Sequence, residues 1–242
     1  MIITLEIYGL RSLVHAVLAA SVRVTNLIKK IIAPLGSSRV TLKAGWLLIC
    51  LTASFSSFTE ARTVKSLFEM RRENVVVQQW DLSCGAAALT TLLNYQHGDM
   101  VSEKQVAMAL MGREEYIKNP MIVNIRQGFS LLDLKRYVDK RGYQGSGYGK
   151  LTLEDLVKKA PILVPINTFG YNHFVIFRGI RGNRVLLADP AWGNRTMLVT
   201  EFDKMWIDFP QIGKVGFVVA RTDGIDPPNF LQPRANEFVM LR

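Results

Sequence analysis

Cysteine and histidine are scarce in this sequence, whose 242 residues include two cysteines and three histidines. Cys50 lies inside an apolar run near the N-terminus, so removal of that run would leave Cys84 as a lone thiol with no partner for an internal disulfide. One cysteine and two histidines are also too few for the usual structural zinc site. We therefore expect no disulfide scaffold, no metal site and no cofactor.

Dense basic clusters are absent as well, although the formal net charge is +10. No run of five basic residues occurs, and aromatic residues are not regularly interleaved with basic ones, so nucleic acid is not an expected partner. A mildly basic surface suits acidic substrates or anionic envelopes instead. The stretch "GSGYGKLT" (Gly145–Thr152) lacks the spacing of a phosphate-binding loop, because Gln144 stands where the first glycine is required. We expect it to be a glycine-rich loop that leads into a helix.

A long apolar run is also missing: the run from Ala44 to Phe55 has about twelve residues, against roughly 20 for a membrane-spanning helix. Basic residues precede it and a small residue follows, so residues 39–61 are predicted to be a signal peptide, with an uncleaved anchor as the alternative. Residues 1–38 are basic and loosely amphipathic, which suits a membrane-surface helix or an extension upstream of the true translation start. We expect the mature protein in the periplasm or cell envelope after export, with membrane contact only through this N-terminal segment.

In the remaining chain, helical patterns come first and strand patterns afterwards, which predicts an α+β fold for a domain over residues 62–221. Amphipathic patterns bounded by capping residues predict helices at 84–95, 102–112, 130–142 and 151–161, with N-caps at Ser102, Ser130 and Thr152. Short β-rich runs predict strands at 162–169, 173–180, 184–190, 195–199 and 215–221. The polar, proline-broken tail at 222–242 is expected to be loose.

Cys84 stands at the start of the first predicted helix, in "QQWDLSCGAAALTTLL". A thiolate is the nucleophilic form of cysteine, and the unpaired backbone N–H groups and positive dipole end of a helix start stabilise it. Gly85 and the alanines that follow would let another layer pack closely on this helix. The alternative interpretation is a buried structural cysteine, which is common in apolar helices.

A nucleophilic thiol needs a base, and His173 is the strongest candidate. His15 lies in the N-terminal extension, and His97 has the surroundings of an exposed loop residue. His173 opens an apolar strand and Asp189 ends the next one, so antiparallel pairing of these strands would place the carboxylate beside the ring. With Cys84 they would form the triad of a cysteine protease, assembled from separate parts of the chain. The alternative for His173 is a core histidine with satisfied hydrogen bonds.

The order and spacing of these residues resemble the peptidase C39 family, the papain-like double-glycine-leader peptidases found on bacteriocin exporters. Gln78 stands six residues before Cys84, Gly85 follows it directly, and His173 and Asp189 are sixteen residues apart. The resemblance implies a papain-like fold with N-terminal helices packed on a C-terminal antiparallel sheet. It also implies these roles: Cys84 as nucleophile, His173 as base, Asp189 as the orienting carboxylate, and Gln78 as side-chain donor to the oxyanion. Only the spacing favours Gln78 over its neighbour Gln79.

The resemblance narrows the function further. The chain is similar to stand-alone exported members of the family, because no membrane region or ATPase follows the domain. The stretch "SLFEMRRENVVVQQWDLSCGAAAL" (residues 66–89) most resembles the members of functional-amyloid secretion systems. This implies an exported cysteine endopeptidase whose partner is a polypeptide substrate, such as an amyloid or another secreted peptide. The alternatives are a papain-like transferase with the same triad and a peptide-binding module that does not cleave. The double-glycine preference belongs to the exporter branch, and this chain contains no Gly-Gly pair.

Overall fold

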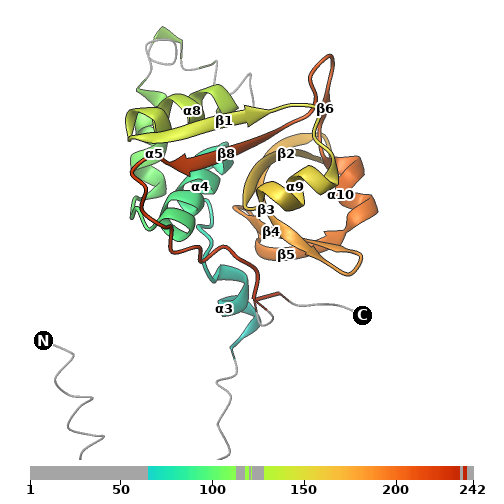
Figure 1. The fold of residues 1–242 in the computed structure, drawn as a ribbon. Helices are drawn as coiled ribbons and strands as arrows, with labels where there is room; N and C mark the ends of the chain where they lie inside the picture. The colour runs from blue at the N-terminus through green and yellow to red at the C-terminus, as the bar shows by residue number, and fades with distance from the viewer. Residues whose placement is uncertain (1–64, 113–117, 120, 122–127, 235–236, 239–242) are drawn as a thin grey trace, which may run out of the picture. The chain divides into compact units, whose positions relative to one another are not determined.

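The computed structural model describes residues 65–112, 118–119, 121, 128–234 and 237–238 (Figure 1). The expectations for residues 1–38 and for a signal peptide at 39–61 concern residues outside those ranges. The described residues belong to one compact unit, which begins at Val64. Among their helices, none combines the length and the apolar character that a membrane crossing requires.

Capping side chains set where most of the helices begin. Ser102, Ser130 and Thr152 each accept a hydrogen bond from the backbone N–H three residues ahead, and the side chain at that position binds the backbone N–H of the cap in return. The three predicted N-caps are therefore confirmed. The described helices are α3 (Leu67–Arg72), α4 (Cys84–Thr91) with its π-helical continuation η1 (Leu92–Gln96), α5 (Glu103–Met111), α8 (Leu131–Lys140), α9 (Leu153–Lys159) and α10 (Val199–Met205).

The strands form one antiparallel sheet of six and a separate short hairpin. The sheet has the order β1-β8-β2-β3-β4-β5, so the predicted strands of the second half of the chain lie side by side. Its strands are β1 (Tyr143–Tyr148), β2 (Ile162–Thr168), β3 (Tyr171–Arg181), β4 (Arg184–Asp189), β5 (Gly193–Leu198) and β8 (Gly216–Arg221). The hairpin pairs β6 (Asp208–Phe209) with β7 (Gly213–Lys214).

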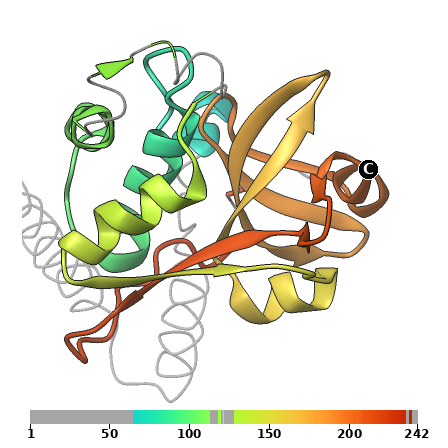
Figure 2. The same ribbon diagram turned by 90° about the horizontal axis from the view of Figure 1, so that it is seen from above.

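Both faces of the sheet are buried. In β2, Leu163 belongs to the core shared with α4, α5 and α8, whereas its neighbours Ile162 and Val164 belong to a second core with α9 and α10. This alternation follows from the two-residue period of a strand. Figure 2 shows the helices that precede the sheet in the chain (green) on one side of it. The helices α9 and α10 (yellow and orange) lie away from that group. The predicted α+β class, with N-terminal helices packed on a C-terminal antiparallel sheet, is confirmed.

The glycine-rich stretch after α8 differs from the expectation of a loop, because Tyr143–Tyr148 form the edge strand β1, paired with β8. The glycines have a packing role here. A Cβ added at Gly145 would lie 2.8 Å from Val138 Cγ2 and 2.9 Å from Phe217 Cζ, so only glycine lets the strand approach α8 this closely. A stretch chosen for close packing therefore has the composition of a loop.

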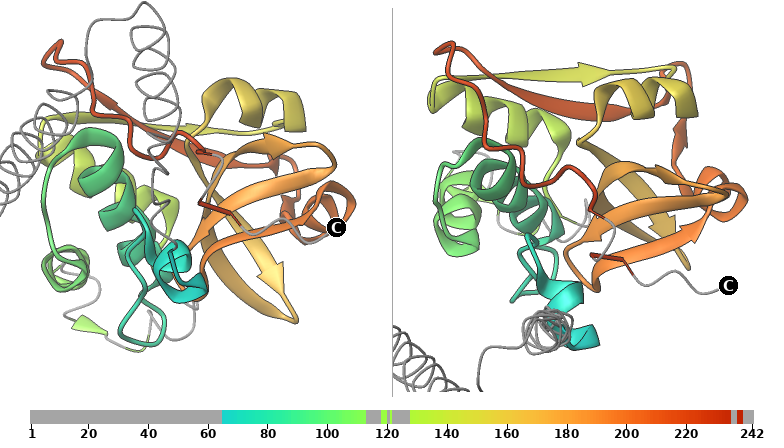
Figure 3. Two further views of the ribbon diagram at one scale, coloured as in Figure 1. Left: turned by 90° about the horizontal axis from the view of Figure 1, so that it is seen from below. Right: turned by 60° about the horizontal axis from the view of Figure 1, so that its bottom comes forward.

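The C-terminal tail also differs from the expectation that it is loose. Its backbone N–H groups at Asn229 and Phe230 donate to the carbonyls of Gln96 and Tyr95, at 3.3 and 2.9 Å, and the Leu231 side chain is fully buried. Figure 3 shows this segment (red) running across α4 towards α3. The described part of the tail is thus a packed strap over α4 and its continuation η1.

A buried arginine on β3 holds this strap in place. Arg178 Nη2 donates to Glu237 Oε2 at 2.6 Å and Nε donates to the Leu231 carbonyl at 2.7 Å, so both charged side chains are paired within the domain. Arg178 Nη1 donates to Asn194 Oδ1 at 2.8 Å, and the Asn194 amide donates to the carbonyls of Met70 and Glu73. One polar network therefore connects the sheet, the tail and the C-terminal end of α3.

Candidate active site

Cys84 is the first residue of α4 and is buried, with 2% of its surface exposed. The first backbone N–H groups of a helix lack partners inside it, so they and the helix dipole favour a thiolate at this position. Ala86, Ala87 and Ala88 are fully buried, and a Cβ added at Gly85 would lie 3.2 Å from Phe174 Cδ2 on β3. The prediction that small residues let another layer pack closely on this helix is confirmed.

The pairing of β3 with β4 brings His173 and Asp189 together. The strands are antiparallel neighbours, and His173 Nε2 lies 2.7 Å from Asp189 Oδ1. Interaction with Cys84 is among the causes that raise the pKa of His173, so the thiol lies close to the imidazole ring. The structure therefore pairs His173 with Asp189 and places both near Cys84, and all three side chains are buried.

The electrostatics of these three residues favour a protonated imidazole. Burial of the ring lowers the pKa of His173, but the hydrogen bonds with Asp189 and Cys84 and the charges of both outweigh burial and raise that pKa to about 9. Burial raises the pKa of Asp189, whereas the hydrogen bond and charge of His173 and the charge of Arg195 lower it overall. The carboxylate is therefore ionised and the imidazole carries its proton at neutral pH.

Asp189 is held by two further donors that sequence reasoning missed. Arg195 Nε donates to Asp189 Oδ2 at 2.7 Å, and the backbone N–H of Ala191 donates to Oδ1 at 2.8 Å. Arg195 lies on β5, across the tight turn that follows Asp189, so the hairpin itself returns this cation to the carboxylate. The sequence offered no clear signal, because the immediate neighbours of Arg195, Asn194 and Thr196, are also polar.

Gln78, in the segment before α4, packs against the turn that follows Asp189. It has no described hydrogen bond to Cys84, His173 or Asp189. Its backbone N–H donates to the Pro190 carbonyl at 2.8 Å, and its Nε2 donates to the Trp80 carbonyl at 3.2 Å. A side-chain amide carries two N–H donors, so this contact leaves the second for another acceptor. Gln79 is exposed, and its backbone N–H is directed to Glu103 instead.

The expectation that His97 is an exposed loop residue is wrong. Its side chain is buried, its ring packs against Tyr143 with centroids 5.2 Å apart, and burial lowers its pKa. The residue follows η1, so it lies at the opposite end of the helical segment that begins at Cys84. Neither His97 nor any other side chain in the described part of the chain belongs to a group of three or more His, Cys, Asp or Glu that could hold a metal ion.

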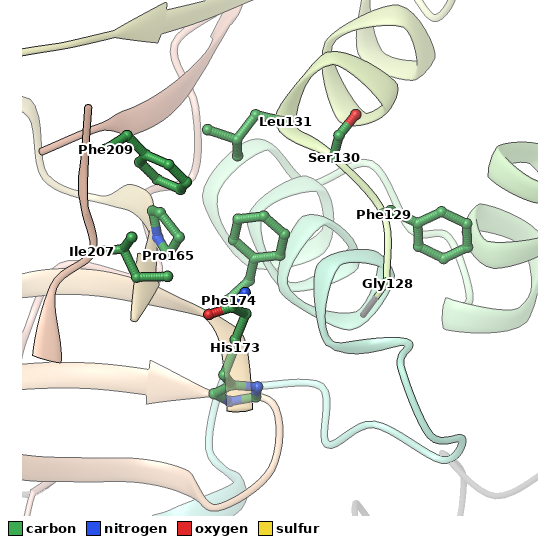
Figure 4. A pocket seen from close by; sticks show the side chains of 10 residues that line it. Gly128, Phe129, Ser130, Leu131, Pro165, His173, Phe174, Ile207 and Phe209 are labelled. Carbon is green, nitrogen blue, oxygen red and sulfur yellow. The ribbon is translucent and has the colours of Figure 1, made fainter. Parts of the chain in front are cut away.

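A pocket of about 320 Å³ opens beside His173 and is mainly apolar. One wall comes from the start of α8, and the opposite wall comes from β2 and from the segment that leads into β6. Figure 4 shows Leu131, Phe174 and Phe209 directed towards the same space, above His173. Leu131 is half-buried, unlike the other residues of the predicted apolar face of α8, because it faces this pocket. The pocket can receive an apolar side chain of a peptide bound near the Cys84–His173 pair.

Sequence comparison relates most of this domain to known proteins. The model of the peptidase C39 family matches residues 72–209. A protein of Pseudomonas aeruginosa named "Probable functional amyloid protease FapD" is 39% identical over 157 residues, which cover 63% of this chain and 66% of that protein. A protein of Pseudomonas fluorescens with the same name is 35% identical over 185 residues, which cover 73% of this chain and 77% of that protein.

Structural comparison gives weaker similarities. A crystal structure of a double glycine motif protease from an AMS/PCAT transporter, in complex with the leader peptide, has a TM-score of 0.48 and 25% sequence identity. The comparison covers 61% of this chain and 91% of that one.

Proposed function

Since this chain belongs to the peptidase C39 family of cysteine peptidases, we propose that it hydrolyses peptide bonds of a secreted polypeptide through a Cys84–His173–Asp189 triad. The observation that carries the proposal is the buried His173–Asp189 hydrogen bond, together with Cys84 at a helix N-terminus and close enough to His173 to raise the pKa of its ring. A thiolate, a protonated imidazole and an ionised carboxylate in this order are the groups that nucleophilic catalysis by cysteine requires.

Each member of the triad has a definite step. The Cys84 thiolate attacks the peptide carbonyl carbon, forming a C–S bond and an oxyanion. The His173 imidazolium gives its proton to the departing amine as the C–N bond breaks, which leaves a thioester and a neutral ring. His173 then takes a proton from water as that water attacks the thioester, releasing the acid and restoring the thiolate–imidazolium pair. Asp189 keeps the ring oriented and stabilises its charge throughout.

Gln78 is the proposed side-chain donor to the oxyanion, together with the backbone N–H of Cys84. Gln78→Ala is expected to lower kcat by about 10²–10³-fold, the usual cost of losing one such donor. The measurement is steady-state hydrolysis of a peptide substrate, and Gln79→Ala is the matched control because the described contact of Gln79 is made by its backbone. If Gln79→Ala lowers kcat and Gln78→Ala does not, the oxyanion donor has been misassigned.

Hydrolysis is expected to fall as the pH rises through about 9, because the acylation step needs the proton of the His173 imidazolium. Burial lowers the pKa of His173, but its hydrogen bonds with Asp189 and Cys84 raise it to about 9, so the proton is present below that pH and lost above it. Asp189→Asn removes the carboxylate and should move this high-pH limb to lower pH while it lowers turnover. The measurement is kcat/KM as a function of pH, and identical limbs in both proteins would contradict the assigned role of Asp189.

The substrate we propose is a secreted polypeptide, in particular one that forms an amyloid. Both Pseudomonas relatives carry the name of a functional amyloid protease, and the apolar pocket beside His173 suits a side chain of an extended peptide. The experiment is incubation of the purified domain with a peptide library and with candidate amyloid polypeptides, followed by mass spectrometry of the products. New termini that depend on Cys84 support the proposal. Binding without cleavage would favour the peptide-binding module, and transfer of the acyl group to added amines rather than to water would favour a transferase.

Export is a further part of the proposal. The apolar run from Ala44 to Phe55, with basic residues before it and a small residue after it, supports cleavage near Arg62. We expect the protein recovered from the cell envelope to begin close to Arg62 when its N-terminus is mapped by mass spectrometry. An intact segment 1–61 would exclude cleavage, and a pool confined to the cytosol would exclude export.

A further inference from the structure

Glu103 is a buried carboxylate to which the proposed mechanism gives no role. It is the first residue of α5 and is 4% exposed. Its oxygens accept hydrogen bonds from the backbone N–H of Gln79, at 3.0 and 3.2 Å, and from the Ser83 hydroxyl, at 2.6 Å. Both donor groups are neutral, and both belong to the loop that precedes α4.

The two partners of Glu103 are the ends of one short segment. Gln79 directly follows Gln78, the proposed oxyanion donor, and Ser83 directly precedes Cys84, the proposed nucleophile. The carboxylate therefore bridges the segment from one functional residue to the other, and the backbone between them is held from a separate helix.

Burial alone does not hold this segment. Trp80 and Asp81 are exposed, and Leu82 has a positive φ of 65°, a conformation that costs energy for a residue with a side chain. Polar contacts supply the restraint: the Ser83 hydroxyl also donates to the Trp80 carbonyl at 2.6 Å, and Gln78 is tied to Pro190. Of these contacts, only those of Glu103 restrain both ends at once.

We propose that Glu103 is a positioning residue that sets the separation between the Gln78 side chain and the Cys84 backbone N–H. The inference rests on the proposed oxyanion role of Gln78. Donors to an oxyanion act only when they lie within hydrogen-bonding distance of the atom on which charge develops, and a displacement of about 1 Å can cost about 10²-fold in rate. A carboxylate suits the task because its hydrogen bonds are short and it accepts from both ends of the segment.

Glu103→Gln tests this inference, because the amide keeps the shape but turns an NH₂ group towards a donor. We expect kcat to fall by about tenfold or more with KM nearly unchanged. The rate at which iodoacetamide alkylates Cys84 should change less than about twofold, because alkylation needs the thiolate but no oxyanion donor. Glu154→Gln is the matched control, since Glu154 is also an acidic residue in the first turn of a helix but is exposed; its kinetics should equal those of the wild type.

A double-mutant cycle separates positioning from a general structural role. If Glu103 acts through Gln78, the substitution Glu103→Gln should lower kcat by less than about threefold in a Gln78→Ala background. Ser83→Ala, which removes one partner and leaves the carboxylate, should give a smaller loss with the same dependence on Gln78. An equal loss of kcat in both backgrounds, or a parallel loss of alkylation, would overturn the inference while the proposed function stands. Full activity of Gln78→Ala would overturn both the oxyanion assignment and this inference, and Cys84-independent hydrolysis would overturn the proposed function itself.

Discussion

Replacing Cys84 by alanine is expected to lower peptide hydrolysis by about 10⁴-fold or more, because no other group can form the thioester intermediate. The substitution removes only a small buried side-chain group, so the protein should remain folded. The measurement is product formation by mass spectrometry over long incubations, with circular dichroism to confirm the fold. Cys84→Ser is the companion variant: it restores a side chain of similar size without a thiol.

The two variants together test whether activity is lost through the missing thiol or merely through the smaller side chain. If loss of volume at the helix start were the cause, Cys84→Ser would recover most of the activity of the wild type. We expect it to be as inactive as Cys84→Ala, because the hydroxyl is not ionised by an imidazole in the way that a thiol is. Hydrolysis by either variant at more than about one hundredth of the wild-type rate would contradict a cysteine nucleophile at this position.

Arg178→Met is expected to lower the free energy of unfolding by about 3–5 kcal/mol, the usual cost of leaving one buried charge without its partner. The change leaves the Glu237 carboxylate with only neutral donors, from Asn74 and the Arg234 backbone, and deprives the Leu231 carbonyl and Asn194 Oδ1 of their donor. The measurement is urea-induced unfolding followed by circular dichroism, in which the midpoint reports the change in stability.

Two controls decide whether the buried pair causes this loss. Lys65→Met removes an ion pair whose lysine side chain is 39% exposed, with Glu73, and should cost no more than about 1 kcal/mol. The double variant Arg178→Met/Glu237→Met removes both charges and should recover part of the stability, since apolar replacements of a buried pair are often tolerated. If Arg178→Met were as stable as the wild type, the contact between the tail strap and the sheet would contribute little to the free energy of unfolding.

Local sequence patterns predicted most of the elements that surround the site. The N-caps at Ser102, Ser130 and Thr152 act within one helical turn, so their signals do not depend on the rest of the fold. Successive residues of strands such as β2 and β4 enter opposite cores and are buried on both faces of the sheet, which is why their apolar runs were nearly continuous. The peptidase C39 family and the cysteine peptidase class expected from the motif spacing are confirmed by the family match and the named relatives.

The failures share a physical cause, which is dependence on distant contacts. Gly145 gives β1 the composition of a loop because Phe217, on the distant partner strand β8, and Val138, on α8, leave no room for a Cβ there. The tail from Thr222 has the composition of a loose segment but is packed, because Leu231 is buried and Glu237 pairs with Arg178, a partner 59 residues away in the chain. The surroundings of His97 in the sequence are those of a loop, although Tyr143 and the sheet edge bury it.

The same contrast between local signals and distant contacts applies to the residues of the candidate site. The residues proposed to carry the chemistry, Cys84, His173 and Asp189, could be identified from residue type, strand order and spacing. Their supports could not: Arg195 and Glu103 are ordinary charged residues until the fold directs them to Asp189 and to the loop before Cys84. Single-sequence reasoning can find groups with rare chemistry, whereas positioning groups use common chemistry and are recognised by their contacts.

The most direct test of the Cys84–His173 pair is the rate of iodoacetamide alkylation at neutral pH, mapped to Cys84 by peptide mass spectrometry. The account predicts that wild-type Cys84 reacts at least about tenfold faster than Cys84 in the His173→Ala variant, because the imidazolium holds the thiol as its reactive thiolate. Equal rates in the two folded proteins would contradict the pairing on which the proposed mechanism rests.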